Sequence, residues 1–294
     1  MPRLDRLATL YVAHPLKYVF GARQRQRVPI LMYHSISDNL FGKSHPYYQI
    51  NTSPKAFGRQ MKWLHDAGYL TLSLSELLEV FEKGLIPAKS VVITFDDGYR
   101  DFYTDAFTYL QRYGFTATIF LATNRIQDTP VRIDGADYLT WSEVLELDAK
   151  GIEFGSHTVS HADLRSLGPE EINYELGFSK ETIEDRLCKP VKLFAYPFAF
   201  PEEDQDFTRF LSGILQNQGF DLGVSTVIGC ASKTDNRFFL PRLPVNSWDD
   251  VRLFQAKLEG CYDWLHGPQR WHKIIHHNVS LMQRATWIES EEMK

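Results

Sequence analysis

The 294-residue sequence lacks features that would place it in a specialised class of protein. It has no apolar run of about eighteen residues or more, so no membrane-spanning helix is expected. Its net charge of −5 includes no overall excess of basic residues, so nucleic acid is not an expected partner. No internal repeat or low-complexity tract is present. These absences leave an ordinary globular α/β protein as the expectation.

Cysteine is also scarce. Cys188, Cys230 and Cys261 are odd in number and far apart, which favours neither a disulfide framework nor a zinc knuckle. A reducing compartment is the easier fit for three such cysteines. The apolar residues 7–13 follow two arginines, but no small-residue cleavage site comes after them. We therefore expect a cytoplasmic protein, with a secreted or periplasmic location less expected.

We expect the first 27 residues to form an arm or a helix outside the main domain. Arg23, Arg25 and Arg27 make it basic, which leaves open a peripheral contact with anionic lipid head groups. A solvated arm is the simpler interpretation. Residues 260–294 contain several histidines and tryptophans without a clean period, and we expect them to pack as a C-terminal extension.

Between these ends, short apolar runs alternate with helical patterns, which is typical of parallel βαβ units. We predict one barrel-like domain over residues 28–259. Its expected helices are 54–67, 75–83, 101–113, 141–150, a segment after Gly168, 206–218 and 248–259. Its expected strands are 28–35, 70–73, 90–95, 116–122, 152–154, 191–196, 221–226 and 238–245.

The stretch from 91 to 99 organises the chain. Its apolar, β-branched start predicts a buried strand, and Asp96, Asp97 and Gly98 follow directly. Buried carboxylates are costly unless they are paired or bind a metal. Because successive strand residues point to opposite faces, the two carboxylates need different environments. One could hold a metal and the other could move a proton, although a turn with a helix-capping aspartate explains an isolated Asp-Asp-Gly equally simply.

A second motif supplies nitrogen ligands. His157 and His161 are four residues apart and follow a short predicted strand. On a helical turn this spacing places both rings on one face. In an α/β barrel the strand ends converge on one face, so both histidines could meet Asp97. Two histidines and one carboxylate form a three-ligand site of the catalytic type. Zinc is the default ion, and cobalt, nickel or iron would also fit.

Three spaced motifs together resemble those of the polysaccharide deacetylases, esterases that remove N- or O-acetyl groups from sugars. They are Thr-Phe-Asp-Asp-Gly at 94–98, His-Thr-x-x-His at 157–161 and Phe-Ala-Tyr-Pro-Phe at 194–198. The resemblance spans about residues 28–245. It implies a distorted (β/α) barrel of about seven parallel strands in a single domain.

The resemblance also implies roles for individual residues. Asp96 matches the catalytic base, and Asp97, His157 and His161 match the metal ligands. The backbone N–H of Phe198 would donate to the tetrahedral oxyanion. The substrate candidates are Tyr196, Pro197, Phe198, Tyr99 and Arg242.

Two departures from the family pattern affect these roles. The third motif often begins with an arginine that pairs with the base, and Ala195 stands in that place; Arg242 is the candidate replacement. The family's general-acid histidine usually lies near the C-terminus. Here the best match is His34, before the base, in the order of the circularly permuted deacetylases of poly-N-acetylglucosamine export. His276 is the rival, and a histidine that only packs at a strand end is the plain alternative.

The resulting hypothesis is a metal-dependent hydrolase that removes acetyl groups, N-acetyl foremost, from a sugar or polysaccharide of a bacterial exopolysaccharide or cell envelope. Two alternatives remain. One is a cytoplasmic deacylase of a lipid- or nucleotide-linked sugar. The other is a catalytically silent carbohydrate-binding protein, which would not need a positioned base.

Overall fold

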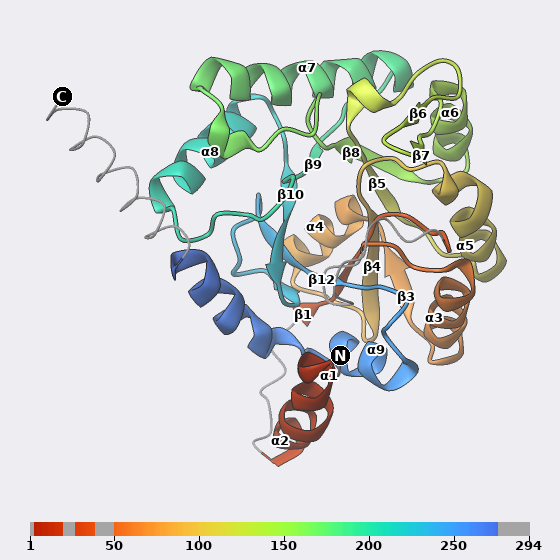
Figure 1. Ribbon diagram of the computed structural model, residues 1–294, viewed down its shortest axis with the longest axis vertical. Helices are drawn as coiled ribbons and strands as arrows, with labels where there is room; N and C mark the ends of the chain where they lie inside the picture. Colours follow the sequence, from red (N-terminus) through yellow and green to blue (C-terminus); the bar gives the residue numbers. More distant parts are fainter. Residues whose placement is uncertain (1–2, 20–26, 39–49, 276–294) are drawn as a thin grey trace, which may run out of the picture.

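The computed structural model describes residues 3–19, 27–38 and 50–275. Its centre is a closed barrel of seven parallel strands (Figure 1). The ring order is β2-β12-β10-β9-β8-β5-β4, and β4 pairs with β2 to close it. A further strand, β3 (Leu70–Leu72), pairs with the first half of β4. The ring strands are β2 (Ile30–Tyr33), β4 (Ser90–Phe95), β5 (Thr118–Leu121), β8 (Glu153–Ser156), β9 (Leu193–Ala195), β10 (Leu222–Ile228) and β12 (Leu240–Pro244).

Helices surround this barrel and also close one of its ends. The surrounding helices are α3 (Pro54–Asp66), α5 (Phe107–Tyr113), α6 (Trp141–Ala149), α7 (Pro169–Leu187), α8 (Gln205–Asn217) and α9 (Val251–Leu258). The helix α4 (Leu74–Lys83) packs Leu74, Leu77 and Phe81 against the side chains inside the barrel. It begins at a capping box formed by Ser73 and Glu76, as the sequence pattern favours.

Several short elements differ from the expected pattern. The predicted strand 28–35 is split, because β1 (Arg27–Val28) leaves the barrel and pairs antiparallel with β11 (Ala231–Ser232). The stretch between the predicted strand 116–122 and the predicted helix 141–150 contains a small antiparallel pair, β6 (Arg132–Ile133) and β7 (Ala136–Asp137). The predicted helix 101–113 starts as a π-helical turn, η3 (Phe102–Ala106). Short 3-10 turns complete the set: η4 (Thr123–Arg125), η5 (Leu164–Ser166) and η6 (Asp263–Leu265).

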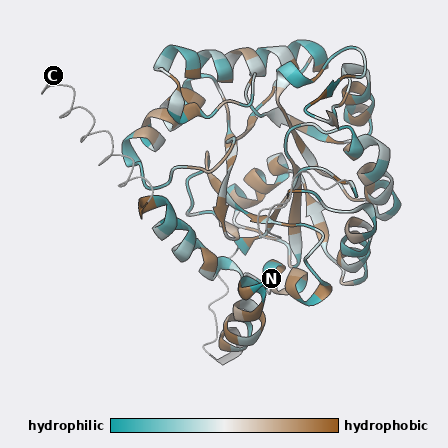
Figure 2. Ribbon diagram, viewed as in Figure 1, coloured by the Kyte–Doolittle hydropathy of each residue, from teal (hydrophilic) through white to brown (hydrophobic). Residues whose placement is uncertain are grey.

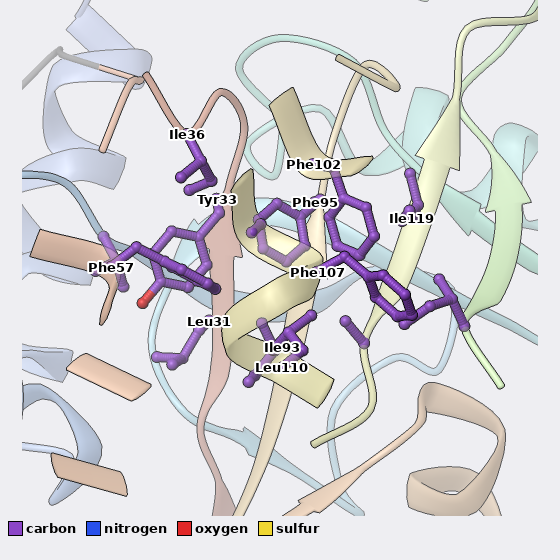
Figure 3. Packing of buried hydrophobic residues seen from close by; sticks show 14 of the residues in the cluster. Leu31, Tyr33, Ile36, Phe57, Ile93, Phe95, Phe102, Phe107, Leu110 and Ile119 are labelled. Atoms are coloured by element: carbon purple, nitrogen blue, oxygen red, sulfur yellow. The ribbon is translucent and has the colours of Figure 1, made fainter. Parts of the chain in front are cut away.

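The two faces of β4 explain why this strand can present a functional group. Val91, Ile93 and Phe95 belong to the core between the barrel and its helices, whereas Val92 belongs to the barrel interior. Figure 3 shows Phe95 between Tyr33 and Phe102, with ring centroids 5.3 and 4.7 Å away. Side chains alternate along a strand, so Phe95 faces the helices outside the barrel and the next residue, Asp96, points into the barrel.

The N-terminal residues form a docked helix, one of the two forms that we expected for this segment, whereas Arg23 and Arg25, for which a solvated arm was the simpler interpretation, lie outside the described residues. α1 (Leu4–Ala8), η1 (Thr9–Ala13) and α2 (His14–Val19) follow one another without a break and contact α9. Arg3 forms a buried ion pair with Asp249, at 2.9 Å, and Asp249 also accepts a hydrogen bond from the buried Lys257. Burial of these charges is tolerated because each one is paired.

The C-terminal extension also packs on the barrel as far as it is described. Residues 266–275 are helical. Gln269 accepts from the Ile228 backbone N–H and donates to the Thr226 carbonyl, while Lys273 donates to the Phe200 carbonyl. His276 and the residues after it lie outside the described chain. Among the described residues, no helix has the length and hydropathy needed to cross a bilayer.

Candidate active site

Asp96 follows β4 directly and points into the barrel, where Arg242 meets it. The Arg242 guanidinium donates from Nη1 and Nη2 to the two carboxylate oxygens of Asp96, both at 2.7 Å. Its Nε donates to the Ser225 carbonyl at 2.9 Å, which fixes the guanidinium plane. Burial alone would raise the pKa of the Asp96 carboxyl, but the charge and hydrogen bonds of Arg242 outweigh burial and hold the pKa below its ordinary value. Asp96 is therefore an ionised carboxylate.

Arg242 does not line a substrate groove, contrary to one of our two expectations for it. It lies on β12 and has no exposed surface. Its position beside Asp96 matches the other role that we expected for it, a cation that pairs with the base. Ala195, at the place where related motifs have arginine, faces the same barrel interior from β9. A guanidinium from β12 thus occupies the space that an arginine from β9 would otherwise need.

His34 follows β2 and lies next to Asp96. Its Nε2 is 3.8 Å from Asp96 Oδ2, and its side chain is 19% exposed. The two residues are neighbours because β2 and β4 pair directly, with Tyr33 opposite Phe95. His34 thus combines contact with the buried carboxylate and access to solvent. His276, the rival candidate, is outside the described residues.

Asp97, His157 and His161 form a compact group of potential metal ligands. Asp97 Oδ1 lies 3.1 Å from His161 Nε2 and 3.6 Å from His157 Nε2, and the three ligand atoms are all within 4.8 Å of one another. No hydrogen bond of acceptable geometry reaches the buried Oδ1 atom. A buried acceptor without a partner, faced by two imidazole nitrogens, is the donor set that a divalent metal takes. These residues therefore fit a catalytic metal.

The orientation of His157 supports the same assignment. Its Nδ1 lies 2.8 Å from the Ala195 carbonyl, which can only accept, so Nδ1 carries the proton and Nε2 presents a lone pair toward Asp97. Burial lowers the pKa of His157 to about 4, which keeps the ring neutral as a ligand requires. The expected helical turn is wrong, however: residues 157–163 form a loop with bends.

The backbone of this region is unusual at four non-glycine residues. Asp97, Thr158, His161 and Phe198 have left-handed φ angles of 74°, 69°, 60° and 59°. Such a conformation costs about 1–3 kcal/mol at each residue and persists only where the surroundings determine it. The left-handed backbone turns the Asp97 side chain away from the direction that alternation along β4 would give it. It also lets both imidazoles face Asp97 from a loop. Nothing in the residue types at these positions predicted it.

Glu175, a residue that sequence reasoning missed, determines the histidine loop. It lies on α7 and is 8% exposed. Its Oε2 accepts from the backbone N–H groups of Val159 and Ser160, both at 2.9 Å, and its Oε1 accepts from Ser160 Oγ at 2.7 Å. One buried carboxylate thus satisfies three donors between the two histidines.

We expect Glu175→Gln to weaken metal binding. The amide keeps the size of the side chain, but its NH₂ group would face donors that now meet a carboxylate oxygen. Groups that orient ligands typically change metal affinity about 10–100-fold when they are altered. A titration of the chelator-stripped protein with Zn²⁺ measures the effect. Glu181→Gln, at an exposed position of the same helix, is the matched control. Equal affinities in both variants would contradict the role of Glu175.

Only one residue of the Tyr-Pro-Phe segment is available to a substrate. Tyr196 has no exposed surface and Pro197 is buried, so the expectation that they contact a sugar is wrong. Tyr196 points away from the barrel interior because it follows the inward-facing Ala195, and its ring packs 5.0 Å from that of Phe200. Phe198 is 54% exposed, and its ring lies 4.5 Å from that of His161.

Thr226 holds the turn that carries Phe198. Its Oγ1 donates to the Phe198 carbonyl at 3.0 Å and accepts from the Phe200 N–H at 2.9 Å. Across the described ranges, no hydrogen bond occupies the Phe198 N–H, so this donor remains open for a ligand beside the histidines. Thr226 lies on β10 and carried no signal in the sequence that linked it to this turn.

Tyr99 forms a second aromatic wall near Asp97. Its ring stacks on that of Tyr138 at 5.0 Å, and Arg125 donates to the Tyr138 hydroxyl at 2.9 Å. Burial, followed by the negative charge of Asp97, raises the pKa of Tyr99. Tyr99 therefore stays a neutral phenol. Its half-buried position is consistent with a contact to substrate.

A second group of ligand-type side chains lies elsewhere, at the junction of the N-terminal helix and α9. It contains His14, Glu259 and Cys261. His14 Nε2 lies 3.4 Å from Glu259 Oε2, so an ion pair already accounts for two of the three residues. No base comparable to Asp96 is among its members.

Comparison with known proteins indicates the family to which this chain is similar. The family profile described as Polysaccharide deacetylase matches residues 83–208. The chain is 33% identical over 234 residues to "Putative polysaccharide deacetylase YxkH" of Bacillus subtilis (strain 168), covering 79% of this chain and 76% of that protein. It is 26% identical over 217 residues to poly-beta-1,6-N-acetyl-D-glucosamine N-deacetylase of Staphylococcus aureus (strain MSSA476), covering 70% of this chain and 71% of that one.

A solved structure gives the same result for the fold. The Streptococcus pyogenes deacetylase PplD in complex with acetate superposes with a TM-score of 0.67 at 26% sequence identity, covering 80% of this chain and 99% of that chain.

Proposed function

This chain belongs to the polysaccharide deacetylase family, and from that premise we propose that it is a metal-dependent N-deacetylase of a polymer of N-acetylglucosamine. The observation that carries the proposal is the pair of adjacent carboxylates with opposite surroundings. Asp96 is locked as an anion by Arg242, while Asp97 faces two imidazoles with an unpartnered oxygen. The name of the Staphylococcus aureus relative supports the choice of substrate.

Asp97, His157 and His161 would hold the metal. When bound, such an ion lowers the pKa of a water molecule to about 7 and polarises a carbonyl oxygen. The remaining work falls to side chains of this protein. A silent binding protein would need none of these ligands and no ionised base beneath them, which is why we favour an enzyme.

Asp96 is the base in this proposal. It accepts a proton from the water whose oxygen attacks the acetamide carbonyl carbon. Its low pKa guarantees that it is ionised across the neutral range, although the pairing with Arg242 also makes it a weaker base. The Phe198 N–H donates to the oxyanion that the attack creates. Tyr99 and Phe198 flank the place where the sugar would lie.

His34 is the general acid. From its place 3.8 Å from Asp96 it can deliver a proton to the amide nitrogen as the C–N bond breaks. The products are acetate and a free amine on the sugar. The proximity of His34 to the base, at the end of the neighbouring strand, supports this role independently of its position in the sequence.

Acetate release from a substrate panel tests the proposal. The protein would be stripped with a chelator and then supplied with Zn²⁺, Co²⁺, Ni²⁺ or Fe²⁺. The panel contains β-1,6-linked N-acetylglucosamine oligomers, O-acetylated xylan, and a lipid-linked and a nucleotide-linked N-acetyl amino sugar. We expect metal-dependent release from the oligomers and none from His34→Ala in the same assay.

Other outcomes of the panel would overturn the proposal in distinguishable ways. Release only from a lipid- or nucleotide-linked sugar would reassign the substrate. Release that is unaffected by the chelator would exclude the metal. If the protein binds metal but releases acetate from none of the substrates, the proposal that it deacetylates these acyl groups would be wrong.

A further inference from the structure

The N-terminal helix presents its apolar side to the outside. Within residues 3–16, the buried side chains are those of Arg3 and Thr9, both polar. Every exposed side chain in this range is apolar, and Figure 2 shows hydrophobic residues along α1 and α2. Five of them are 42–73% exposed: Leu4, Leu7, Tyr11, Val12 and Leu16. A helix that packs on a soluble domain normally has the opposite arrangement.

Contacts made by the polar side of the N-terminal helix explain why this side, and not the apolar side, faces the protein. Arg6 forms an ion pair with Asp250 at 2.6 Å, in addition to the buried pair of Arg3 with Asp249. Asp5 accepts from the Tyr262 hydroxyl at 2.7 Å, and Thr9 accepts from the Trp264 indole at 3.0 Å. His14 pairs with Glu259. These contacts along the helix attach its polar side to the residues just before α9 and just after it, so its apolar side is fixed outward.

Basic residues follow the exposed apolar residues in the sequence. The first 37 residues contain Asp5 as their single acidic residue and six basic ones. Three of the six, Arg3, Arg6 and Arg27, pair with Asp249, Asp250 and Asp263. The other three, Lys17, Arg23 and Arg25, come after the apolar side chains in the sequence with no acidic residue among them. The whole protein, in contrast, has a net charge of −5. A hollow between the helix and α9 is lined by Leu10, Tyr11, His14, Arg252 and Gln255, with no acidic residue among them.

We propose that this helix lies in the surface of an anionic phospholipid membrane. A helix with an exposed apolar face and basic flanks binds in the interface plane by burying that face among the acyl chains while its cations meet the head groups. A second copy of this chain is a poorer occupant, because it would bring an equally basic stretch against the first. Anionic lipid satisfies the apolar face and the positive charge together.

Flotation with lipid vesicles tests the proposal. The full chain is mixed with vesicles of phosphatidylcholine alone or of phosphatidylcholine with phosphatidylglycerol. We expect binding to the anionic vesicles and weaker binding to the neutral ones. The double variant Leu7→Glu/Tyr11→Glu should lower the partition coefficient at least about tenfold, since each side chain contributes through its burial. Release of acetate from a soluble oligomer should be unchanged.

Leu85→Glu is the matched control, because Leu85 is 77% exposed but lies between α4 and β4. It should bind vesicles as the unaltered protein does. Absence of binding by the unaltered protein, or equal binding by the double variant, would overturn the proposal. Self-association that the double variant abolishes, without vesicle binding, would assign the face to a second copy. None of these results depends on whether the chain deacetylates its proposed substrate.

Discussion

Replacing Arg242 with methionine should remove most acetate release at neutral pH and destabilise the fold. The substitution leaves Asp96 as a buried carboxylate without its cation. Breaking a buried ion pair in this way costs about 3–5 kcal/mol of unfolding free energy. Urea unfolding of both proteins measures that loss, and we expect a lower midpoint with an unchanged slope.

The pH dependence of the same variant isolates the effect on the base. In the unaltered protein Arg242 outweighs burial, and the pKa of Asp96 lies below its ordinary value. Without Arg242, burial is opposed only by the weaker influence of His157 and His34, so the pKa of Asp96 should rise. Asp96 is active only when ionised, so the acid limb of the rate profile should move to higher pH. A part of the lost activity should return as the pH is raised.

Two further variants sharpen this result. Arg242→Lys keeps a charge but not the two-pronged contact, so its acid limb should lie between those of the other two proteins. Arg209→Met removes one member of an exposed ion pair with Asp206, and we expect almost no change in stability or rate. An Arg242→Met protein that is folded and has an unshifted acid limb would show that Arg242 does not control the base.

Replacing His157 with alanine should abolish both metal binding and activity. The imidazole is one of three potential ligands, and its Nε2 is aimed at Asp97 by the contact of Nδ1 with the Ala195 carbonyl. Because loss of a group that merely orients a ligand costs about 10–100-fold in affinity, loss of the ligand should cost more. The measurement is metal content after dialysis, paired with acetate release.

His65→Ala controls for the general loss of a histidine. His65 is exposed on α3 and stacks near Tyr113, away from Asp97. This variant should retain its metal and its rate. If His157→Ala kept stoichiometric metal after dialysis, the assignment of Asp97, His157 and His161 as the metal site would be wrong.

Local patterns were sufficient to predict the barrel and the neighbourhood of the site. Strand 90–95 was predicted with the bounds that β4 has, and the predicted helices 54–67 and 141–150 begin where α3 and α6 begin. The alternation along β4 also places Asp96 inside the barrel. Strand ends converge in such a fold, so residues that follow strands directly could be expected to meet. His34, Asp97 and His157 do meet for this reason.

We predicted wrongly that Tyr196 contacts a sugar because we did not apply the alternation of side chains to β9. Alternation along β9 turns Ala195 inward and Tyr196 outward, and the sequence motif alone hid this difference. Another feature had no local signal at all: Glu175 reaches the histidine loop from α7. Arg242 was expected beside the base only because this chain lacks the usual arginine of the family pattern, and it reaches Asp96 across 146 residues of sequence. Contacts of this kind follow from the packed fold, not from spacing.

The inverted N-terminal helix shows a further limit. Its apolar positions resemble those of any amphipathic helix that packs on a core. Which side faces the barrel depends on acceptors far along the chain, among them Asp249 and Asp250. A pattern of apolar residues predicts a face but does not say what the face meets.

Closure of the barrel by its last strand has a consequence for how the protein is made. Synthesis delivers the ligands and the base first, while β12, which joins β10 to β2 and carries Arg242, emerges after them. Until then β2 and β10 are open edges, prone to pair with other chains. A nascent or prematurely terminated chain would hold Asp96 without its counter-charge. The site is therefore complete only after β12 has been made, and fragments that end before residue 240 should be inert and prone to aggregate.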